Sequence, residues 1–181
     1  MIKLEPASLN PPPGLRELLA DLGDGESGFM GTPVHTGETT LEVYLQRCYD
    51  MPNPAKLQPG FVPQTVFWAL NAKGEAIGMV RLRHFLNDKL RIQGGHCGYY
   101  TCRDQRGKGY AKTMLSLALN ELRRRGEARA LITTDPDNFA SIRVIEANGG
   151  QFSDESTDPE MGARYRRYWI DLARKSPVPA A

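Results

Sequence analysis

A short stretch in the middle of the chain, QRGKGYAKTML, combines two glycines with basic side chains. Gly107 and Gly109 leave room for backbone N–H groups to converge on an anion. A helical apolar pattern starts directly after Gly109, so the positive end of a helix dipole points the same way. Three basic side chains add charge: Arg106, Lys108 and Lys112. The stretch predicts a pyrophosphate cradle, and a glycine turn with a solvated basic edge is the alternative.

Two common phosphate-binding motifs do not fit this stretch. The Walker pattern needs Ser or Thr after its lysine, but Lys108 is followed by Gly109, and no glycine stands five residues upstream. The dinucleotide fingerprint needs a third glycine, and that place holds Ala111 and Lys112. Neither a nucleotide triphosphatase loop nor a dinucleotide fold is therefore predicted.

The elements that must position this loop lie after Pro63. The sequence predicts a β-hairpin in QTVFWALNAKGEAIGMVRLRHF, followed by a strand in GHCGYYTC. A long helix follows in GKGYAKTMLSLALNELRRRG, with Ala111, Met114, Leu115, Ala118 and Leu122 on one face. Then come a strand in RALITT, a capped helix in DNFASIRVIEANGG and a last strand in RYRRYWIDL. A hairpin followed by alternating strands and helices favours a mixed α/β or α+β sheet.

The first part of the chain is less regular. Most of the 13 prolines precede residue 65, and two helices are predicted there, in GLRELLADLG and GETTLEVYLQRCYD. We expect one domain over residues 1–181, with an irregular region at 1–64, a regular core at 65–172 and a tail at 173–181 whose end, KSPVPAA, is frayed.

Composition narrows the class of protein. Hydrophobic residues make up 40% and charged residues 24% of the 181 residues, as in an ordinary globular enzyme. A net charge of +2 disfavours nucleic acid as a partner. No apolar run is long enough for a signal peptide or a membrane span, so we expect a cytoplasmic protein without a membrane partner. The 3 cysteines lack metal-ligand spacing, which predicts reduced thiols and no metal. A homodimer remains open.

Two of these patterns together resemble a known family. Arg106-x-x-Gly109-x-Ala111 after a strand is similar to the acyl-CoA-binding motif of the GNAT superfamily of N-acetyltransferases, and DNFASIRVIEANGG is similar to its second signature. The resemblance covers about residues 65–172, with a first strand at IKLEP. It implies that 65–172 is the cofactor-binding core and that 1–64 is the family's variable region on the acceptor side. It implies a central mixed, largely antiparallel sheet flanked by helices, with two strands after the Gly-Gly pair. It also implies a splayed strand pair that holds acetyl-CoA.

The resemblance assigns cofactor contacts to particular residues. The pyrophosphate would lie on Arg106, Gly107, Lys108, Gly109, Tyr110, Ala111 and Lys112. Pantetheine would pair with the backbone near Tyr100, Thr101 and Cys102, where the strand ends in a bulge and splays from RALITT, and a free N–H there would polarise the thioester carbonyl. Asn138 would contact the cofactor arm and also cap its helix, and Ser141 would contact the arm or act as a surface serine.

The sequence departs from the family at Ile145, where many members place a tyrosine that protonates the leaving thiolate. Isoleucine cannot donate a proton. A thiol has a pKa of about 8.5, so the thiolate leaves more readily than an alkoxide without help. Three tyrosines are unranked substitutes: Tyr99, Tyr165 and Tyr168.

The amine acceptor needs a base, because a lysine-like amine has a pKa of about 10.4. His96 is the first candidate, since it lies where many relatives carry a glutamate, and its ordinary pKa near 6.5 suits proton transfer. A strand histidine bonded to a neighbouring carbonyl is the alternative, and His84 and His35 are weaker candidates. Side chains of the N-terminal region are candidates for the acceptor wall: Glu38, Glu42, Phe61 and Trp68.

The predicted function is transfer of acetyl from acetyl-CoA to a primary amine of a small molecule or peptide. The missing tyrosine at Ile145 also fits a non-catalytic acyl-CoA-binding module. The mixed basic and aromatic segment RYRRYW suggests a ribosome- or RNA-associated protein as a third interpretation, although strand alternation explains that segment more simply.

Overall fold

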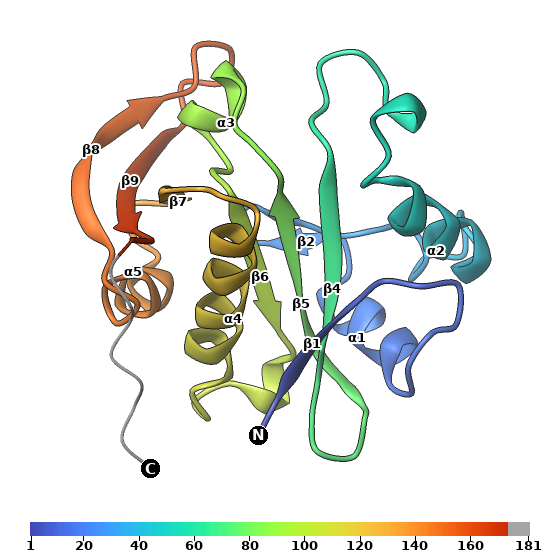
Figure 1. Ribbon diagram of the computed structural model, residues 1–181. Coiled ribbons are helices and arrows are strands. Elements are labelled where there is room, and N and C mark those ends of the chain that lie inside the picture. Colours follow the sequence, from blue (N-terminus) through green and yellow to red (C-terminus); the bar gives the residue numbers. More distant parts are fainter. Residues whose placement is uncertain (174–181) are drawn as a thin grey trace.

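The computed structural model describes residues 1–173, which form a sheet in two parts with helices on both faces (Figure 1). The first part has the strand order β1 (Lys3–Pro6), β4 (Gln64–Leu70), β5 (Ala76–Arg83) and β6 (Cys97–Thr101). The second part has the order β7 (Arg129–Thr134), β9 (Arg164–Asp171) and β8 (Gln151–Thr157). All neighbouring strands pair antiparallel. The predicted mixed α/β fold with a largely antiparallel sheet is therefore confirmed.

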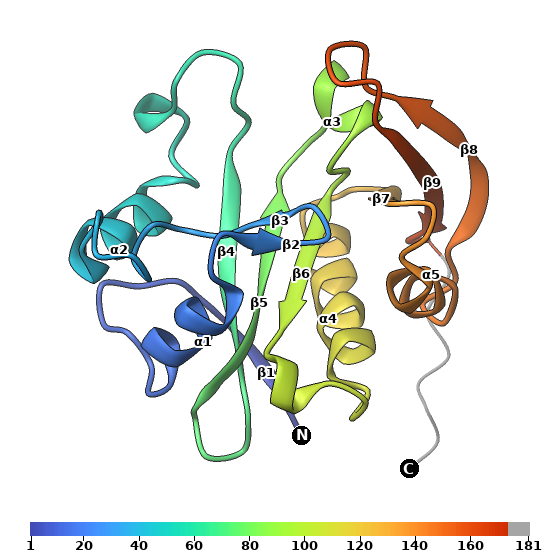
Figure 2. The same ribbon diagram turned by 180° about the vertical axis from the view of Figure 1, so that it is seen from behind.

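Helices cover both faces of the sheet. On one face lie α1 (Leu15–Leu22) and α2 (Leu41–Asp50), together with a short hairpin of β2 (Gly25–Glu26) and β3 (Phe29–Met30) that crosses the sheet (Figure 2). The opposite face carries α4 (Tyr110–Arg124) and α5 (Phe139–Glu146). The short helix α3 (Asp88–Ile92) connects β5 to β6, and two 3₁₀ turns span Pro54–Lys56 and Arg103–Gln105.

Strand alternation divides the core into two clusters. On β4, Phe67 and Ala69 point towards α4, whereas Val66, Trp68 and Leu70 pack with α1 and α2. Successive side chains of a strand point to opposite faces, and both faces are covered here. The run TVFWAL is therefore apolar without a break, as in a strand buried on both sides.

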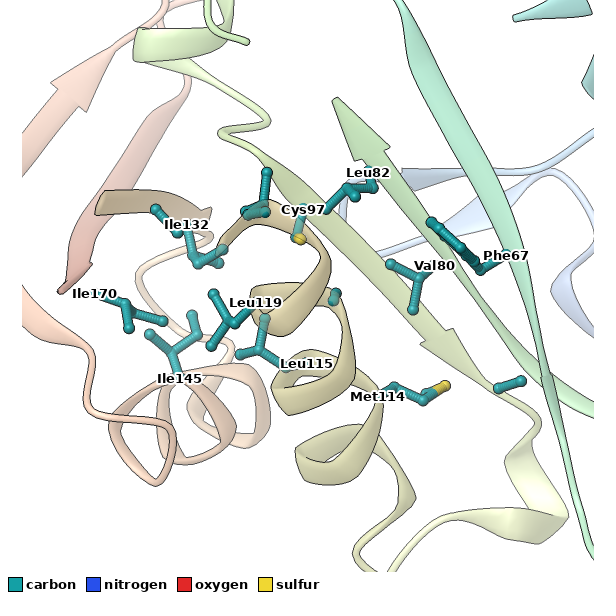
Figure 3. Close-up of a cluster of buried hydrophobic side chains, with 14 of the residues drawn as sticks. Phe67, Val80, Leu82, Cys97, Met114, Leu115, Leu119, Ile132, Ile145 and Ile170 are labelled. Carbon is teal, nitrogen blue, oxygen red and sulfur yellow. The ribbon is translucent and has the colours of Figure 1, made fainter. Parts of the chain in front are cut away.

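The helix α4 is the central element of the larger cluster (Figure 3). Its buried residues follow the helical repeat: Met114, Leu115, Ala118, Leu119 and Leu122. Burying a leucine side chain stabilises the fold by about 2 kcal/mol. The apolar face predicted from the sequence included Ala111, which is only partly buried, and left out Leu119, which is buried. A Cβ on Gly78 of β5 would lie 2.5 Å from the Tyr100 carbonyl oxygen and 3.0 Å from the Met114 sulfur, so only glycine permits this close packing.

The two parts of the sheet meet beside His96 and then separate. The His96 N–H donates to the Leu131 carbonyl at 2.7 Å. A Cβ on Gly95 would lie 2.3 Å from the same oxygen, so the approach requires glycine. Beyond this point β6 pairs only with β5, and β7 only with β9, among residues 1–173. This is the predicted splay. The predicted bulge in β6 is not found: the register shifts lie at Ala69/Leu70 in β4 and Phe152/Asp154 in β8.

The predicted helices and strands are all present, with boundaries shifted by a few residues. Residue patterns did not predict β2, β3 or α3, and β8 was expected only from the family resemblance. The predicted frayed end, residues 175–181, lies outside the described residues. No helix within residues 1–173 is long and apolar enough to cross a membrane, and no cluster of potential metal ligands is found there.

Candidate active site

A cavity of about 980 Å³ occupies the opening between β6 and β7 and extends to the glycine loop. A volume of this size is typical of a ligand site. Most of the predicted cofactor residues line it: Tyr100, Thr101, Arg106, Gly107, Gly109, Tyr110, Ala111, Lys112, Asn138 and Ser141. Three predicted residues do not: His96, Cys102 and Lys108. Lys108 instead donates from Nζ to the side-chain oxygen of Gln105 at 3.0 Å.

The glycine loop has the backbone that an anion cradle needs. Gly107 and Gly109 adopt φ values of 76° and 77°, in the left-handed region that favours glycine. No atom lies within 4 Å of the position that a Cβ would take on either residue, so both face open space. Gly109 is the N-cap of α4, and as a glycine it provides no side-chain cap. The first N–H groups of that helix are therefore available to a ligand.

Arg106 is held by a residue that the sequence did not indicate. Its Nη1 and Nη2 donate to the two carboxylate oxygens of Glu26 at 2.8 and 2.9 Å, and its Nε donates to the Thr101 carbonyl at 3.1 Å. The guanidinium lies 5.4 Å from the Tyr100 ring centroid. The hydrogen bond from Arg106 is the main cause of a lowered Glu26 pKa. The β2–β3 hairpin is thereby joined to the glycine loop.

A second carboxylate fixes the end of β6. Asp21, on α1, accepts a hydrogen bond from the Tyr100 hydroxyl at 2.7 Å and another from the Arg103 N–H at 2.9 Å. Both donors belong to the segment that runs from β6 into the glycine loop. The edge of β6 that faces the cavity is therefore held in place from the opposite side of the sheet.

The helix α5 presents two polar residues to the cavity. Asn138 caps the helix, because its side-chain oxygen accepts the Ser141 N–H at 3.0 Å. The Ser141 hydroxyl lies 2.8 Å from the Tyr99 hydroxyl, which reaches across the opening from β6. Burial raises the pKa of Tyr99 to about 12, so this phenol is protonated at neutral pH.

Of the three tyrosines considered as proton donors, two line the cavity. These are Tyr99 and Tyr165. Tyr168 is in the core, 5.7 Å from the ring of Phe152, and is removed from the cavity. Ile145 is fully buried in the same core, one turn of α5 beyond Ser141. The proton donor that the resemblance implies at this position is therefore absent.

The structure does not support His96 as the base. His96 is buried, with only 3% of the residue exposed, and it does not line the cavity. Its Nδ1 accepts the Leu131 N–H at 2.9 Å, so the ring proton must reside on Nε2 and no lone pair is free. Burial lowers the pKa of His96 to about 4, and the 3.9 Å approach of Glu127 is therefore a polar contact and not an ion pair. The alternative, a strand histidine whose ring is bonded to a neighbouring carbonyl, holds only in part: the ring is bonded to the neighbouring backbone, but it accepts the Leu131 N–H and forms no hydrogen bond to a carbonyl within the described residues.

The other histidines are also outside the cavity lining. His84 contacts the Thr65 hydroxyl at 2.8 Å, and His35 contacts the Thr32 carbonyl at 2.7 Å. Of the four candidates for the acceptor wall, only Phe61 lines the cavity. Trp68, on β4, is buried against α2.

The sequence missed a further group of residues that line the cavity. These come from the β2–β3 hairpin, from β5, from the end of β7 and from the β8–β9 turn: Glu26, Phe29, Arg81, Asp135, Asp158 and Glu160. One signal was present, because Asp135 directly follows the strand RALITT, and polar residues at strand ends often form sites. The others come from turns, whose positions depend on tertiary contacts.

Comparisons with known proteins agree with this geometry. The family described as acetyltransferase (GNAT) domain matches residues 20–151. The chain therefore belongs to the GNAT acetyltransferase family. It is an acyltransferase, and its cofactor is acetyl-CoA. No curated protein matches the sequence.

Solved structures share the fold at low sequence identity. A variant of the spermidine N-acetyltransferase SpeG from Vibrio cholerae superposes with a TM-score of 0.65 at 15% identity, over 95% of this chain and 94% of that chain. An N-acetyltransferase from Staphylococcus aureus Mu50 gives 0.62 at 14%, over 95% and 99%. The GNAT domain of S. lividans PAT gives 0.59 at 17%, over 94% and 90%. The chain thus spans nearly the whole length of these proteins.

Proposed function

We propose that the protein is an N-acetyltransferase that moves acetyl from acetyl-CoA to a primary amine of a small molecule or peptide, by direct attack of the amine. The opening between β6 and β7 beside the Gly107–Gly109 loop carries this proposal. It joins an unpaired strand edge to a helix N-terminus, and these are the two features that a pantetheine arm and a pyrophosphate need.

The cofactor-binding residues follow from that opening. The backbone from Arg106 to Lys112 would hold the pyrophosphate, and Lys112, at the start of α4, would add charge. The open edge of β6 at Thr101 would pair with the pantetheine arm, whereas the backbone groups of Tyr100 face β5. Asn138 and Ser141 would contact the arm from α5. When bound, acetyl-CoA supplies an acetyl thioester. Cys102 and Lys108 do not line the cavity, so no side-chain contact with the cofactor is proposed for them.

The chain's own groups would then assist the transfer. The acceptor ammonium would first lose a proton to water in the cavity, because a protonated nitrogen has no lone pair. The neutral amine would then form its bond to the acetyl carbon while backbone N–H groups on the unpaired edge of β6 stabilise the negative charge on the acetyl oxygen, and a second amine proton would pass to water as the C–S bond breaks. Tyr99 would give its hydroxyl proton to the departing sulfur, because it is protonated at neutral pH and is held by Ser141 on the helix where relatives place their tyrosine. This assignment supports catalysis despite the isoleucine at position 145.

Thiol release tests the function directly. Purified protein is given acetyl-CoA and, in turn, alkylamines, polyamines, peptides with free N-termini and aminoglycosides, and free thiol is measured with time. We expect acceptor-dependent release with at least one amine, and mass spectrometry should find an acetylated product. Slow thiol release that no acceptor accelerates, with intact binding of coenzyme A in calorimetry, would instead favour the non-catalytic acyl-CoA-binding module.

A further inference from the structure

Asp135 is an unpaired carboxylate in the wall of the cavity. It directly follows Thr134, the last residue of β7, and it is half-buried. Its backbone carbonyl accepts the Asn138 N–H at 3.1 Å, which fixes the turn into α5. No ion pair or hydrogen bond to its side chain is found within residues 1–173. Burial, and then the neighbouring Asp137, raise the pKa of Asp135.

Tyr165 is the second polar group at this place. It is only 8% exposed and lines the cavity, yet its hydroxyl has no hydrogen-bond partner within the described part of the chain. The pairing of Arg166 with Thr134 brings Tyr165 beside the end of β7. Burial raises the pKa of Tyr165, and the charges of Asp135 and Asp158 act in the same direction, as expected for neighbours.

The β8–β9 turn completes this end of the cavity with a fixed carboxylate. Asp158 accepts the N–H groups of Glu160 and Met161 at 2.8 and 2.9 Å, and its own N–H donates to the Ala163 carbonyl at 2.8 Å. These bonds close the turn and hold Asp158 against the cavity. Two carboxylates therefore flank one buried phenol, from two separate elements of the fold.

A half-buried carboxylate without a partner has lost part of its hydration, so a cation or a hydrogen-bond donor that reaches it from the cavity is bound favourably. No Lys, Arg or His side chain within residues 1–173 forms an ion pair with Asp135. The described residues also contain no group of ligands that could hold a metal ion. A cation that enters with the substrate amine can therefore pair with Asp135, and the Tyr165 hydroxyl oxygen, which has no partner in the described chain, can accept a hydrogen bond from the same N–H donors.

We propose that Asp135 and Tyr165 bind the protonated amine of the acceptor and thereby select aliphatic ammonium acceptors over neutral aromatic amines. This inference rests on the proposed function, because it concerns the acceptor of that reaction. An alkylamine carries a positive charge at pH 7, whereas an arylamine is neutral there because the ring delocalises its lone pair. The Asp135 charge therefore contributes to binding of the first class and not of the second.

The test compares n-butylamine with p-toluidine as acceptors at pH 7, for the wild type and for Asp135→Asn. We expect kcat/KM for n-butylamine to fall about 10- to 100-fold, the size of a lost charged hydrogen bond, with KM raised more than kcat is lowered. For p-toluidine, kcat/KM should change less than about twofold. If p-toluidine is not acetylated, its inhibition constant against n-butylamine takes the place of kcat/KM.

Tyr165→Phe should show the same selectivity with a smaller loss. The matched control is Asp137→Asn, an exposed neighbour outside the cavity lining, which should alter neither amine.

Equal losses for both amines in Asp135→Asn, or no loss for either, would overturn the proposal, since a purely structural role affects both. Failure of the proposed function looks different: the wild type would bind coenzyme A and acetylate no amine. In that case, n-butylamine binding to the coenzyme A complex is measured by NMR titration. Unchanged affinity in Asp135→Asn would then reject the ammonium site, and a tenfold weaker affinity would support it.

Discussion

Glu26 and Arg106 form a two-point ion pair, with N–O distances of 2.8 and 2.9 Å between the guanidinium and the two carboxylate oxygens. The pair joins the β2–β3 hairpin, on the acceptor side, to the loop predicted to hold the pyrophosphate. Arg106 is therefore already partly neutralised by its own chain, and the cofactor phosphates would compete with Glu26 for it.

This competition predicts an unusual result for Glu26→Gln. Both partners are partly exposed, so the loss of stability should be small, about 0.5–1 kcal/mol in denaturant unfolding. Affinity for coenzyme A should rise severalfold in calorimetry, because the Arg106 charge becomes free for phosphate. Glu42→Gln, which removes an exposed pairing with Arg16 at 3.9 Å, serves as the control. Weaker binding in Glu26→Gln would mean that Glu26 positions Arg106 and does not compete for it.

The glycine loop permits a test with a built-in comparison. Gly109 and Gly126 stand at the two ends of α4, with φ values of 77° and 89°, and neither has an atom within 4 Å of the position that a Cβ would take. An alanine at either site should cost about 1 kcal/mol of stability through the strained backbone. Only Gly109→Ala should weaken coenzyme A binding, because its methyl group enters the cavity. Similar affinities for the two variants would show that the anion cradle is elsewhere.

Tyr99→Phe tests the proposed proton donor. The substitution keeps the ring and removes the hydroxyl that contacts Ser141 at 2.8 Å. We expect turnover to fall about 10- to 100-fold. This is at or below the smallest effects usual for the loss of a general acid, because a thiolate leaves readily without protonation. Coenzyme A affinity should stay within a few-fold of wild type. Tyr49→Phe, on the exposed face of α2, is the control. Full turnover in Tyr99→Phe would leave solvent as the proton source.

The buried His96 predicts how stability depends on pH. Its folded pKa of about 4 is below the ordinary value of 6.5, so the unfolded chain binds more protons between these values. The contribution of His96 to the free energy of unfolding is therefore fully present above about pH 6.5. It is lost as the pH is lowered towards 4, by an amount on the order of 3 kcal/mol.

The variant His96→Asn should keep an acceptor for the Leu131 N–H while removing the titration. We expect its unfolding free energy to vary much less between pH 4 and 6.5 than that of wild type, with turnover at neutral pH nearly unchanged. His35→Asn is the matched control. A large loss of turnover in His96→Asn, with coenzyme A binding intact, would instead support His96 as the base.

Local patterns were sufficient for most of the fold. The helical repeat of α4 and the unbroken apolar run of β4 each reflect packing that is encoded over a few residues. The glycine loop was recognisable for the same reason, because Gly107 and Gly109 need their backbone conformation locally. The short strands β2 and β3 have no such pattern. They depend on contacts such as Glu26 with Arg106, 80 residues apart in the chain.

The acceptor end of the cavity was harder to predict than the cofactor end. His96 appeared suitable because its type and position fit a base, but the direction of its side chain depends on Leu131 in another strand. Asp135 and Tyr165 come together only through the pairing of β7 with β9. A single sequence gives the residue types at such positions and not their partners.

The separation of β6 from β7 also links the stability of the fold to ligand binding. An unpaired strand edge is normally a liability that proteins cover. If the cofactor pairs with this edge as proposed, its binding free energy adds to the stability of the folded chain. At one hundred times its dissociation constant, a ligand that binds only the folded state adds about 2.7 kcal/mol of stability. The lifetime of this protein in a cell should therefore rise and fall with the supply of coenzyme A.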